Sequence, residues 1–263
     1  MGWLSYLWDN LLKAGLWLRS PRLVRFHMNR ALWDLGYPWT RLQPIALDQL
    51  FPGIVASPVV LELVRPFERR RGTSLELEEL ITILAIQRFI GATRIVEVGT
   101  FDGNTTIHLA LNAGSAGRVV TIDLPPQGAA TTDYAGTGGP APFSQRQYEA
   151  HPAATRVSQV LGDSAALDWS ALGGPFDLIF IDGDHRSRYV RSDTRNALSV
   201  LRPGGVILWH DYEYRSVSAV LDAAAARGER IHWIQGTRIA VGFFDSPRES
   251  ECHFQSESPE SRP

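Results

Sequence analysis

The regular alternation of strand-like and helix-like segments constrains the fold of this chain more than any other feature. From Thr73 onward, short apolar runs alternate with stretches whose apolar residues recur at helical spacing. The expected strands are 94–98, 119–122, 157–161, 176–181, 206–209, 231–234 and 239–243, and the expected helices include 105–112, 189–201 and 216–227. Such alternation produces a parallel sheet with helices on both faces. We therefore predict an α/β fold with a doubly wound, mostly parallel seven-stranded sheet over residues 73–245.

The two ends of the chain differ from this regular part. Residues 1–72 are expected to form a helical N-terminal extension, because five of the eight tryptophans and six basic residues lie in the first 41 positions. Leucines and Trp8 recur there at helical spacing, which predicts an amphipathic helix. Residues 246–263 are rich in Ser, Glu and Pro with few apolar side chains, and we expect a disordered tail.

Two interpretations of residues 1–41 stand. The segment can lie on a membrane surface, with Trp rings at headgroup level and arginines facing anionic lipid. It can instead pack on the α/β domain or on a second subunit of a homodimer, because Trp and Arg are frequent in protein interfaces. The chain has no run of 18 apolar residues, and its start lacks the pattern of a secretory signal. We expect a cytoplasmic protein, peripheral at the inner membrane face under the first interpretation.

Residue counts argue against several classes of function. The 263-residue chain has a formal net charge of −2, so we expect no nucleic-acid partner. Cys252 is the only cysteine and Lys13 the only lysine, and both lie near the chain ends. A disulfide framework, a cysteine-based zinc site, a Cys-His nucleophile, a Schiff-base lysine and a P-loop lysine are therefore not expected.

Glycines and a carboxylate follow the first two expected strands, at the sheet edge where parallel sheets bind ligands. The first strand leads into Glu97-Val98-Gly99-Thr100-Phe101-Asp102-Gly103, in which the two glycines allow a tight turn and close backbone approach. The spacing is G-x-x-x-G, which argues against a dinucleotide pyrophosphate. Asp123 ends the second strand, where an acidic side chain accepts hydrogen bonds from ribose hydroxyls.

Several motifs in this order resemble the class I S-adenosylmethionine-dependent methyltransferases. They are Glu97-x-Gly99-x-x-x-Gly103, Asp123, Gly162-Asp163-Ser164 and Leu201-Arg202-Pro203-Gly204-Gly205. Within that group, Asp182-Gly183-Asp184-His185 and Trp209-His210-Asp211-Tyr212 are similar to the macrolide-sugar and catechol-type metal-dependent O-methyltransferases. The resemblance extends from about Leu75 to Phe244 and implies the Rossmann-like methyltransferase fold.

The resemblance implies S-adenosylmethionine as cofactor and assigns its binding residues. Gly99, Thr100 and Gly103 would line the methionine portion, and Glu97 would help to hold the amino group. Asp123 would bind the ribose, and Asp163 and Ser164 would lie beside the adenine. The structural alternatives are a plain strand-to-helix turn for each glycine and a helix cap for Asp123.

A divalent metal site is expected where two further strands end. Asp182 and Asp211 follow buried strands, and carboxylates there are costly unless paired or bound to a cation. Oxygen ligands suit magnesium. The family commonly has an acidic or amide ligand beside the second aspartate, whereas this chain has His210 and Tyr212. An imidazole suits manganese, iron or zinc better than magnesium, so a softer ion, or a water as the third ligand, is an alternative to magnesium. The expected ligands are Asp182, His210 and Asp211. The alternative is that His210 bonds to backbone and no metal binds.

Methyl transfer to a hydroxyl requires a group that takes the hydroxyl proton. Catechol-type relatives use a lysine three residues after the first metal aspartate, and His185 stands there in this chain. A neutral imidazole is a competent base near neutral pH. The resemblance thus implies catalytic roles for His185 and Asp182. The alternative is that His185 caps the next helix or contacts Asp184.

The sequence therefore predicts an S-adenosylmethionine-dependent O-methyltransferase that acts on a sugar, a glycan-type acceptor or another small molecule. Residues 125–151 form a long connection that is either a lid over the substrate or a variable surface loop. One alternative function is a nicotinamide-dependent oxidoreductase, which the missing G-x-G-x-x-G disfavours. Another is a non-catalytic, membrane-associated protein that keeps the methyltransferase fold.

Overall fold

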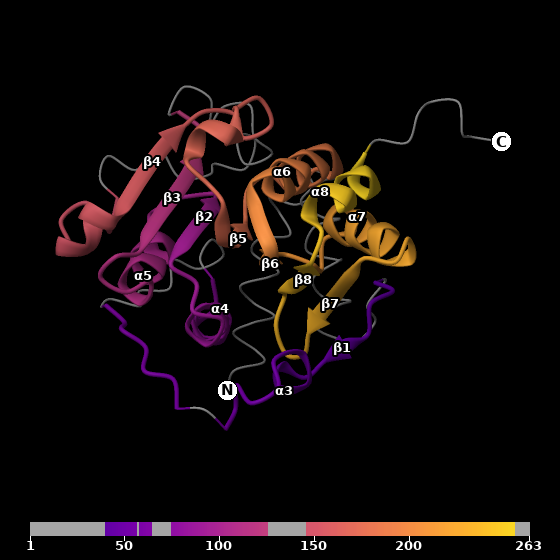
Figure 1. The fold of residues 1–263 in the computed structure, drawn as a ribbon, viewed down its shortest axis with the longest axis horizontal. Coiled ribbons are helices and arrows are strands. Elements are labelled where there is room, and N and C mark those ends of the chain that lie inside the picture. Colours follow the sequence, from indigo (N-terminus) through magenta and orange to yellow (C-terminus); the bar gives the residue numbers. More distant parts are fainter. Residues whose placement is uncertain (1–39, 57, 65–74, 126–145, 256–263) are drawn as a thin grey trace, which may run out of the picture.

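A single eight-stranded sheet forms the centre of the molecule in the computed structural model, which describes residues 40–56, 58–64, 75–125 and 146–255 (Figure 1). The strand order is β1-β7-β8-β6-β5-β2-β3-β4. Neighbouring strands are parallel except where β8 pairs with β6 and β7. The strands are β1 (Pro44–Ile45), β2 (Arg94–Val98), β3 (Arg118–Asp123), β4 (Val157–Leu161), β5 (Phe176–Ile181), β6 (Leu201–Trp209), β7 (Arg230–Ile234) and β8 (Ala240–Phe244). The predicted doubly wound, mostly parallel sheet is confirmed.

Helices cover both faces of this sheet. In Figure 1, α4 and α5 lie on one side, and α6, α7 and α8 lie on the other. The α-helices are α3 (Leu47–Leu50), α4 (Leu77–Phe89), α5 (Asn104–Asn112), α6 (Ser187–Val200), α7 (Arg215–Ala226) and α8 (Pro247–Ser250). The described residues also form the short 3-10 helices η3 (Pro152–Arg156), η4 (Trp169–Leu172) and η5 (Glu251–Phe254).

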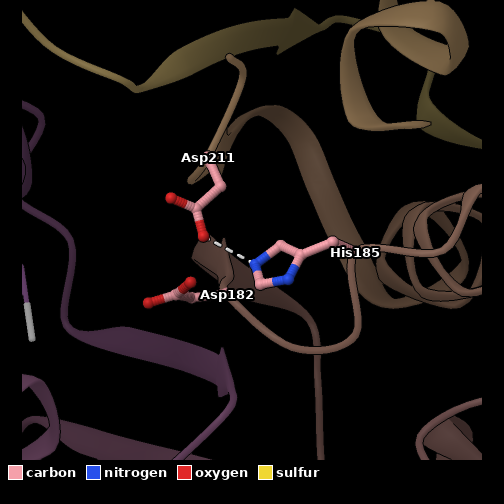
Figure 2. Close-up of side chains that lie close together, drawn as sticks. All are labelled: Asp182, His185 and Asp211. Carbon is pink, nitrogen blue, oxygen red and sulfur yellow. Dashed lines mark ion pairs between the residues drawn. The ribbon is translucent and has the colours of Figure 1, made fainter. Parts of the chain in front are cut away.

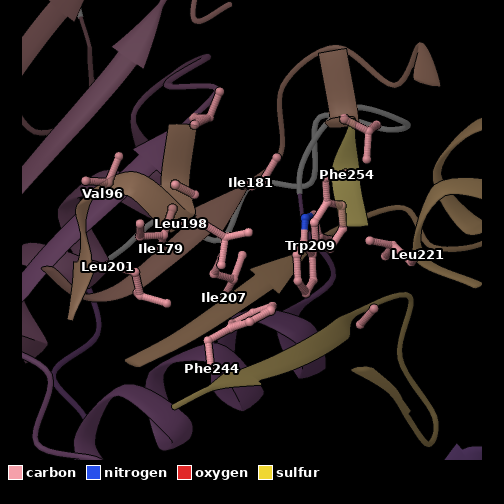
Figure 3. Close-up of a cluster of buried hydrophobic side chains, with 14 of the residues drawn as sticks. Val96, Ile179, Ile181, Leu198, Leu201, Ile207, Trp209, Leu221, Phe244 and Phe254 are labelled. Atoms are coloured by element: carbon pink, nitrogen blue, oxygen red, sulfur yellow. The ribbon is translucent and has the colours of Figure 1, made fainter. Parts of the chain in front are cut away.

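Alternating side chains of the central strands enter two separate cores. In β5, Leu178 and Phe180 pack with α4 and α5, whereas Ile179 and Ile181 pack with α6 and α7 (Figure 3). Because consecutive side chains of a strand point to opposite faces, a strand buried on both faces must be apolar throughout. This is why continuous apolar runs marked the central strands in the sequence.

The strand order reverses beside β2, which pairs with β3 on one side and with β5 on the other. In this register Val98 lies opposite Ile122 and Ile181, and Ile181 in turn lies opposite Trp209. The carboxyl ends of four strands thus meet at one edge, the usual ligand-binding edge of an open α/β sheet.

The N-terminal extension contributes to the sheet, which the sequence did not predict. Its β1 pairs with β7 and adds an eighth strand to the expected seven. Phe51 and Ile54 of the same extension are buried against the α4 side of the sheet. A two-residue strand that contains a proline is compatible with this edge position because Pro44 needs no partner for an N–H group.

The expectation of a disordered tail is wrong for residues 247–254. They form α8 and η5, and Phe254 is only 1 % exposed within the core on the α6 and α7 side (Figure 3). The buried ring of Phe254 anchors this polar segment to the core, although the composition of the segment predicted no such contact.

Three expectations fall wholly or mainly on residues outside the described part of the chain. They concern the amphipathic segment in residues 1–39, most of the connection 125–151, and the last eight residues of the tail. Membrane-surface contact and homodimer formation through residues 1–41 stay predictions. Among the described residues, no helix is both long enough and apolar enough to span a membrane.

Candidate active site

The loop after β2 wraps closely around the end of β5. Gly99 has φ +100°, and a Cβ atom placed on it would lie 2.2 Å from the backbone oxygen of Asp182. Gly103, with φ +81°, is the N-cap residue of α5. Phe101, between them, also has a positive φ of +48°, which is strained for a residue with a side chain. A pocket beside this loop is lined by Leu75, Gly99, Thr100, Phe101, Asp102, Asn104, Thr105 and Asp182.

Glu97 lies beneath this loop and is fully buried. Its Oε2 accepts hydrogen bonds from the hydroxyls of Thr106, at 2.5 Å, and Thr121, at 2.6 Å. The Thr121 hydroxyl also lies 2.7 Å from that of Thr100. Burial outweighs the two hydrogen bonds and raises the pKa of Glu97 to about 8. The group is therefore mostly uncharged at neutral pH.

Asp123 is the last residue of β3 and is already paired in the structure. Its Oδ2 accepts a hydrogen bond from Nη2 of Arg146 at 2.9 Å, and its Oδ1 accepts one from the backbone of Leu124. Burial raises the pKa of Asp123, while the Arg146 guanidinium acts in the opposite direction. The residue expected to bind ribose therefore has a cationic partner that the sequence analysis missed.

Asp163 and Ser164 follow β4 at the same edge. Oδ1 of Asp163 accepts from the backbone of Ala165 at 3.0 Å, and its Oδ2 accepts from the Tyr189 hydroxyl at 3.3 Å. The carbonyl of Ser164 accepts from Trp169 and Asn196. These bonds fix the loop between β4 and η4 against α6.

Asp182, His185 and Asp211 lie close together at the ends of β5 and β6 (Figure 2). Nε2 of His185 is 2.6 Å from Oδ2 of Asp211. Asp211 has φ +55°, a left-handed conformation that is uncommon for aspartate and typical of functional sites. Burial lowers the pKa of His185 and the Asp211 carboxylate raises it, with a net rise. These three side chains therefore meet at one edge of the sheet.

His210 lies deeper than these three residues and contacts carboxylates through both ring nitrogens. Its Nδ1 is 3.2 Å from Oδ1 of Asp182 and from Oδ1 of Asp211, and its Nε2 is 3.1 Å from Oε2 of Glu79. Burial alone would lower the pKa of His210, but Asp211 and Asp182 hold it well above its usual value. His210 therefore acts here as a buried cation between three carboxylates.

A partly buried arginine completes this charge cluster. Arg238, in the turn between β7 and β8, donates to both oxygens of Glu79 at 3.0 and 2.6 Å. Its Nη1 also lies 3.2 Å from Asp211 Oδ1 and 3.5 Å from Glu213 Oε1. Despite burial, His210 and Arg238 lower the pKa of Glu79 to about 2. Burial and the nearby Asp211 raise the pKa of Glu213 to about 8.

Tyr212 stands where the resembling enzymes have a further metal ligand, and its side chain serves another purpose. Its hydroxyl donates to Oδ1 of Asp222 at 2.5 Å and accepts from the backbone N–H of Leu42 at 3.3 Å. Asp222 also accepts from the backbone of Arg41. Tyr212 therefore anchors the start of the described chain and is not positioned as a ligand.

The donor atoms at this edge fit a divalent cation. One atom each from Asp182, His185 and Asp211 can be chosen so that all three lie within 4.8 Å of one another. Two carboxylate oxygens and an imidazole nitrogen suit manganese, and magnesium is compatible with the carboxylates. His185 completes this group in place of the expected His210, whose two nitrogens face carboxylates. The assignment of ligands stays a prediction.

Part of the chain is similar in sequence to known methyltransferases. Residues 96–212 match the family described as Methyltransferase domain, Methyltransf_24. The chain is 33% identical over 132 residues to a catechol O-methyltransferase of Mycobacterium tuberculosis, covering 46% of this chain and 54% of that protein. It is 29% identical over 150 residues to the mouse catechol O-methyltransferase domain-containing protein 1, covering 53% and 50%. The chain thus spans about half the length of these curated relatives.

Solved structures give the same result for the fold. Cofactor-bound Rv0187 from MTB superposes with a TM-score of 0.51 at 25% identity over 66% of this chain and 83% of that chain. The likeness to the class I S-adenosylmethionine-dependent methyltransferases is confirmed. An O-methyltransferase from Bacillus cereus shares the methyltransferase fold, with a TM-score of 0.50 at 20% identity over 82% and 97% of the two chains.

The predicted cofactor-binding residues lie at the ends of three neighbouring strands. Glu97, Gly99, Thr100 and Gly103 lie at the end of β2 and the start of α5, Asp123 at the end of β3, and Asp163 and Ser164 after β4. These strands are adjacent in the sheet, in the order β2-β3-β4. The individual roles of these residues stay predictions.

Proposed function

We propose that the chain is an S-adenosylmethionine-dependent O-methyltransferase. One observation carries the proposal most directly: Asp182 lines the pocket of the Gly99 loop and also belongs to the group formed with His185 and Asp211. A cofactor bound along the loop would place its methionine end beside a group suited to hold and deprotonate a hydroxyl. Binding of donor and acceptor at adjoining sites is the geometry that direct transfer requires.

The proposed cofactor contacts combine the roles that the family resemblance implies with the hydrogen-bonding groups that this chain offers. The ribose diol would bind the carboxylate of Asp123, and the amino group would approach Glu97. Oε1 of Glu97 is buried and accepts no hydrogen bond from any described residue. An ammonium group placed there would satisfy this acceptor and favour the ionised carboxylate. The family likeness supports this cofactor, and the comparisons do not favour the nicotinamide-dependent alternative.

A divalent metal would be held by Asp182 and Asp211, with magnesium or manganese as the proposed ion. When bound, it would lower the pKa of an acceptor hydroxyl and fix the position of the oxygen. We propose His185 as the general base that receives the hydroxyl proton. Asp211 orients the imidazole through the 2.6 Å contact with Nε2. His210 and Arg238 lie on the other side of Asp211 and hold its carboxylate in place.

The acceptor is proposed to be a sugar or glycan-type hydroxyl. Support comes from the runs Asp182-Gly183-Asp184-His185 and His210-Asp211-Tyr212, which resemble those of enzymes that methylate sugars. A sugar hydroxyl is weakly acidic, so a histidine base positioned by a carboxylate suits it. A catechol is the second candidate, because the 33% identical relative is named a catechol O-methyltransferase.

The test is a methyl-transfer assay with labelled S-adenosylmethionine, sugar and catechol panels, and magnesium, manganese or excess chelator. His185→Ala is expected to lower kcat by roughly 10²–10⁴-fold through loss of the base. His232→Ala is the matched control, because His232 lies on β7, two strands away from β6, and its ring faces Phe243 of β8. Manganese affinity is measured in parallel, since a loss of affinity in His185→Ala would identify a ligand. Full turnover in His185→Ala would contradict the base, and full activity in chelator would contradict the metal.

A further inference from the structure

Residues 146–148 contact the loop of residues 99–103, which joins β2 to α5 and is here called the cofactor loop, at three points. The backbone N–H of Gln147 donates to the carbonyl of Asp102 at 2.8 Å, and its side chain donates to Oδ2 of Asp102 at 3.0 Å. The buried ring of Tyr148 packs so closely on Gly103 that a Cβ atom there would lie 2.8 Å from it. The Tyr148 hydroxyl donates to Gln159 of β4 at 3.0 Å. The backbone on which Arg146 sits is therefore fixed beside the loop.

This anchoring directs Arg146 at the carboxylate that ends β3. The side chain of Arg146 is 10 % exposed and that of Asp123 is 25 % exposed, so the ion pair is largely shielded from water. Asp123 also accepts from the backbone of Leu124. A carboxylate that already carries a guanidinium and a backbone donor has fewer lone pairs, and less uncompensated charge, to offer another ligand.

We propose that Arg146 competes with the ribose hydroxyls of the cofactor for Asp123 and thereby limits cofactor affinity. The inference rests on the proposed function, because it requires the ribose to bind Asp123. Cofactor binding then exchanges an arginine–carboxylate bond for hydroxyl–carboxylate bonds, and the guanidinium must move by side-chain rotation because Gln147 and Tyr148 hold the backbone.

Competition by Arg146 would act on ligand binding and not on the methyl-transfer step. S-adenosylmethionine and its product S-adenosylhomocysteine carry the same ribose, so Arg146 weakens the binding of both ligands. Because the ribose takes no part in the reaction, this loss of binding energy leaves the chemical step unchanged. Its effect is faster release of the product.

The experiment is calorimetric titration of the full-length protein with each ligand at pH 8, well above the ordinary pKa of a carboxyl group. Arg146→Met, and Arg146→Gln as a second variant, are expected to lower both dissociation constants by about tenfold, the scale of one charge-assisted hydrogen bond. Arg156→Met is the matched control, because Arg156 donates to the carbonyl of Ala110 and is expected to have no effect. In an Asp123→Asn background, Arg146→Met is expected to change neither constant.

Each outcome is decisive. A tenfold gain for both ligands that disappears in the Asp123→Asn background supports the proposal. Unchanged or weaker binding in Arg146→Met overturns it, as does an effect on only one ligand or a gain that persists without Asp123. Failure of both variants to fold would assign Arg146 to stability and also overturn it. If the wild-type protein binds neither ligand, the proposed function itself fails, which the wild-type titration reveals alone.

Discussion

Glu97 shows how a single residue can link cofactor binding to the stability of the domain. Its carboxyl group is fully buried, and two threonine hydroxyls donate to one oxygen while no described residue donates to the other. Burial raises its pKa to about 8 from the ordinary value of 4.5. The folded state therefore holds a proton that the unfolded chain has already lost at neutral pH.

This difference predicts a pH dependence of stability. Between about pH 4.5 and 8 the native state binds one more proton at this position, so the free energy of unfolding falls as pH rises, by up to about 1.4 kcal/mol per pH unit. Below pH 4.5 the contribution is fully present, and above pH 8 it is lost. Urea unfolding of wild type and Glu97→Gln across this range should show a shallower slope in the variant, because the variant loses the contribution of Glu97 while that of Glu213 stays in both proteins. Exposed Glu149→Gln is the control, and parallel curves for wild type and Glu97→Gln would contradict the assignment.

The contact between Gly99 and Asp182 couples the cofactor loop to the catalytic edge. A methyl group at Gly99 would lie 2.2 Å from a backbone oxygen, which no side-chain rotation can relieve. Gly228 has nearly the same φ, +102° against +100°, but a Cβ atom there meets nothing within 4 Å. Alanine variants at these two glycines therefore separate the loss of stability caused by a positive φ from the loss caused by the collision.

We expect Gly228→Ala to lower the free energy of unfolding by about 1–2 kcal/mol, the cost of the left-handed conformation. Gly99→Ala should cost at least about 2 kcal/mol more, because the collision adds overpacking strain, and it should abolish cofactor binding. Urea unfolding and titration with S-adenosylmethionine measure both effects. Equal stability losses in the two variants would show that the loop can move away from β5.

At the scale of elements, apolar runs predicted the central strands because both of their faces are buried. The bounds of β2, β4 and β5 coincide with the predicted segments. The sequence analysis did not predict β1, α8 and η5. These elements have two to four residues each, which is too short for a hydrophobic period to be recognised. Their conformation depends on contacts with β7 and with the core, and these contacts are remote in sequence.

The same distinction applies to the candidate site. Asp123, Asp182 and Asp211 were predictable because each follows a recognisable strand, and adjacent parallel strands end at one edge. Glu79 and Arg238 were not, because Glu79 reaches His210 across 131 positions and Arg238 across 159. The carboxylates of Asp182 and Asp211 predicted that a cation would lie beside them, but not which residue supplies it. Nothing local to Arg238 distinguishes it from the other arginines.

The C-terminal segment provides a prediction at this scale. Phe254 of η5 fills the core beside Trp209 and Leu221, so Phe254→Ala is expected to cost about 3–5 kcal/mol through lost burial and a cavity (Figure 3). Cys252→Ala is the matched control, because Cys252 lies in the same short helix and is exposed. Urea unfolding midpoints of the two variants compare them directly. A small effect of Phe254→Ala would mean that α8 and η5 detach from the domain at little cost.

For the molecule as a whole, the strand order turns local strand ends into one continuous site. β3, β2, β5 and β6 are consecutive in the sheet, and they end at Asp123, near Gly99, at Asp182 and near Asp211, respectively. A ligand that contacts several of these ends bridges central strands that share both cores. Its binding energy therefore opposes global unfolding rather than the opening of one loop.

The resulting prediction is a thermal shift specific to the proposed cofactor. At 100 times its dissociation constant, S-adenosylmethionine should stabilise the native state by about 2.7 kcal/mol, which corresponds to a rise in Tm of roughly 5–10 °C for a domain of this size. Asp123→Asn should reduce the shift at the same ligand concentration, because it removes the anionic ribose acceptor at the end of β3. NADH is the ligand control and is expected to leave Tm unchanged, since the loop lacks the glycine spacing that a dinucleotide pyrophosphate needs. A shift with NADH and none with S-adenosylmethionine would assign the edge of the sheet to nicotinamide chemistry instead.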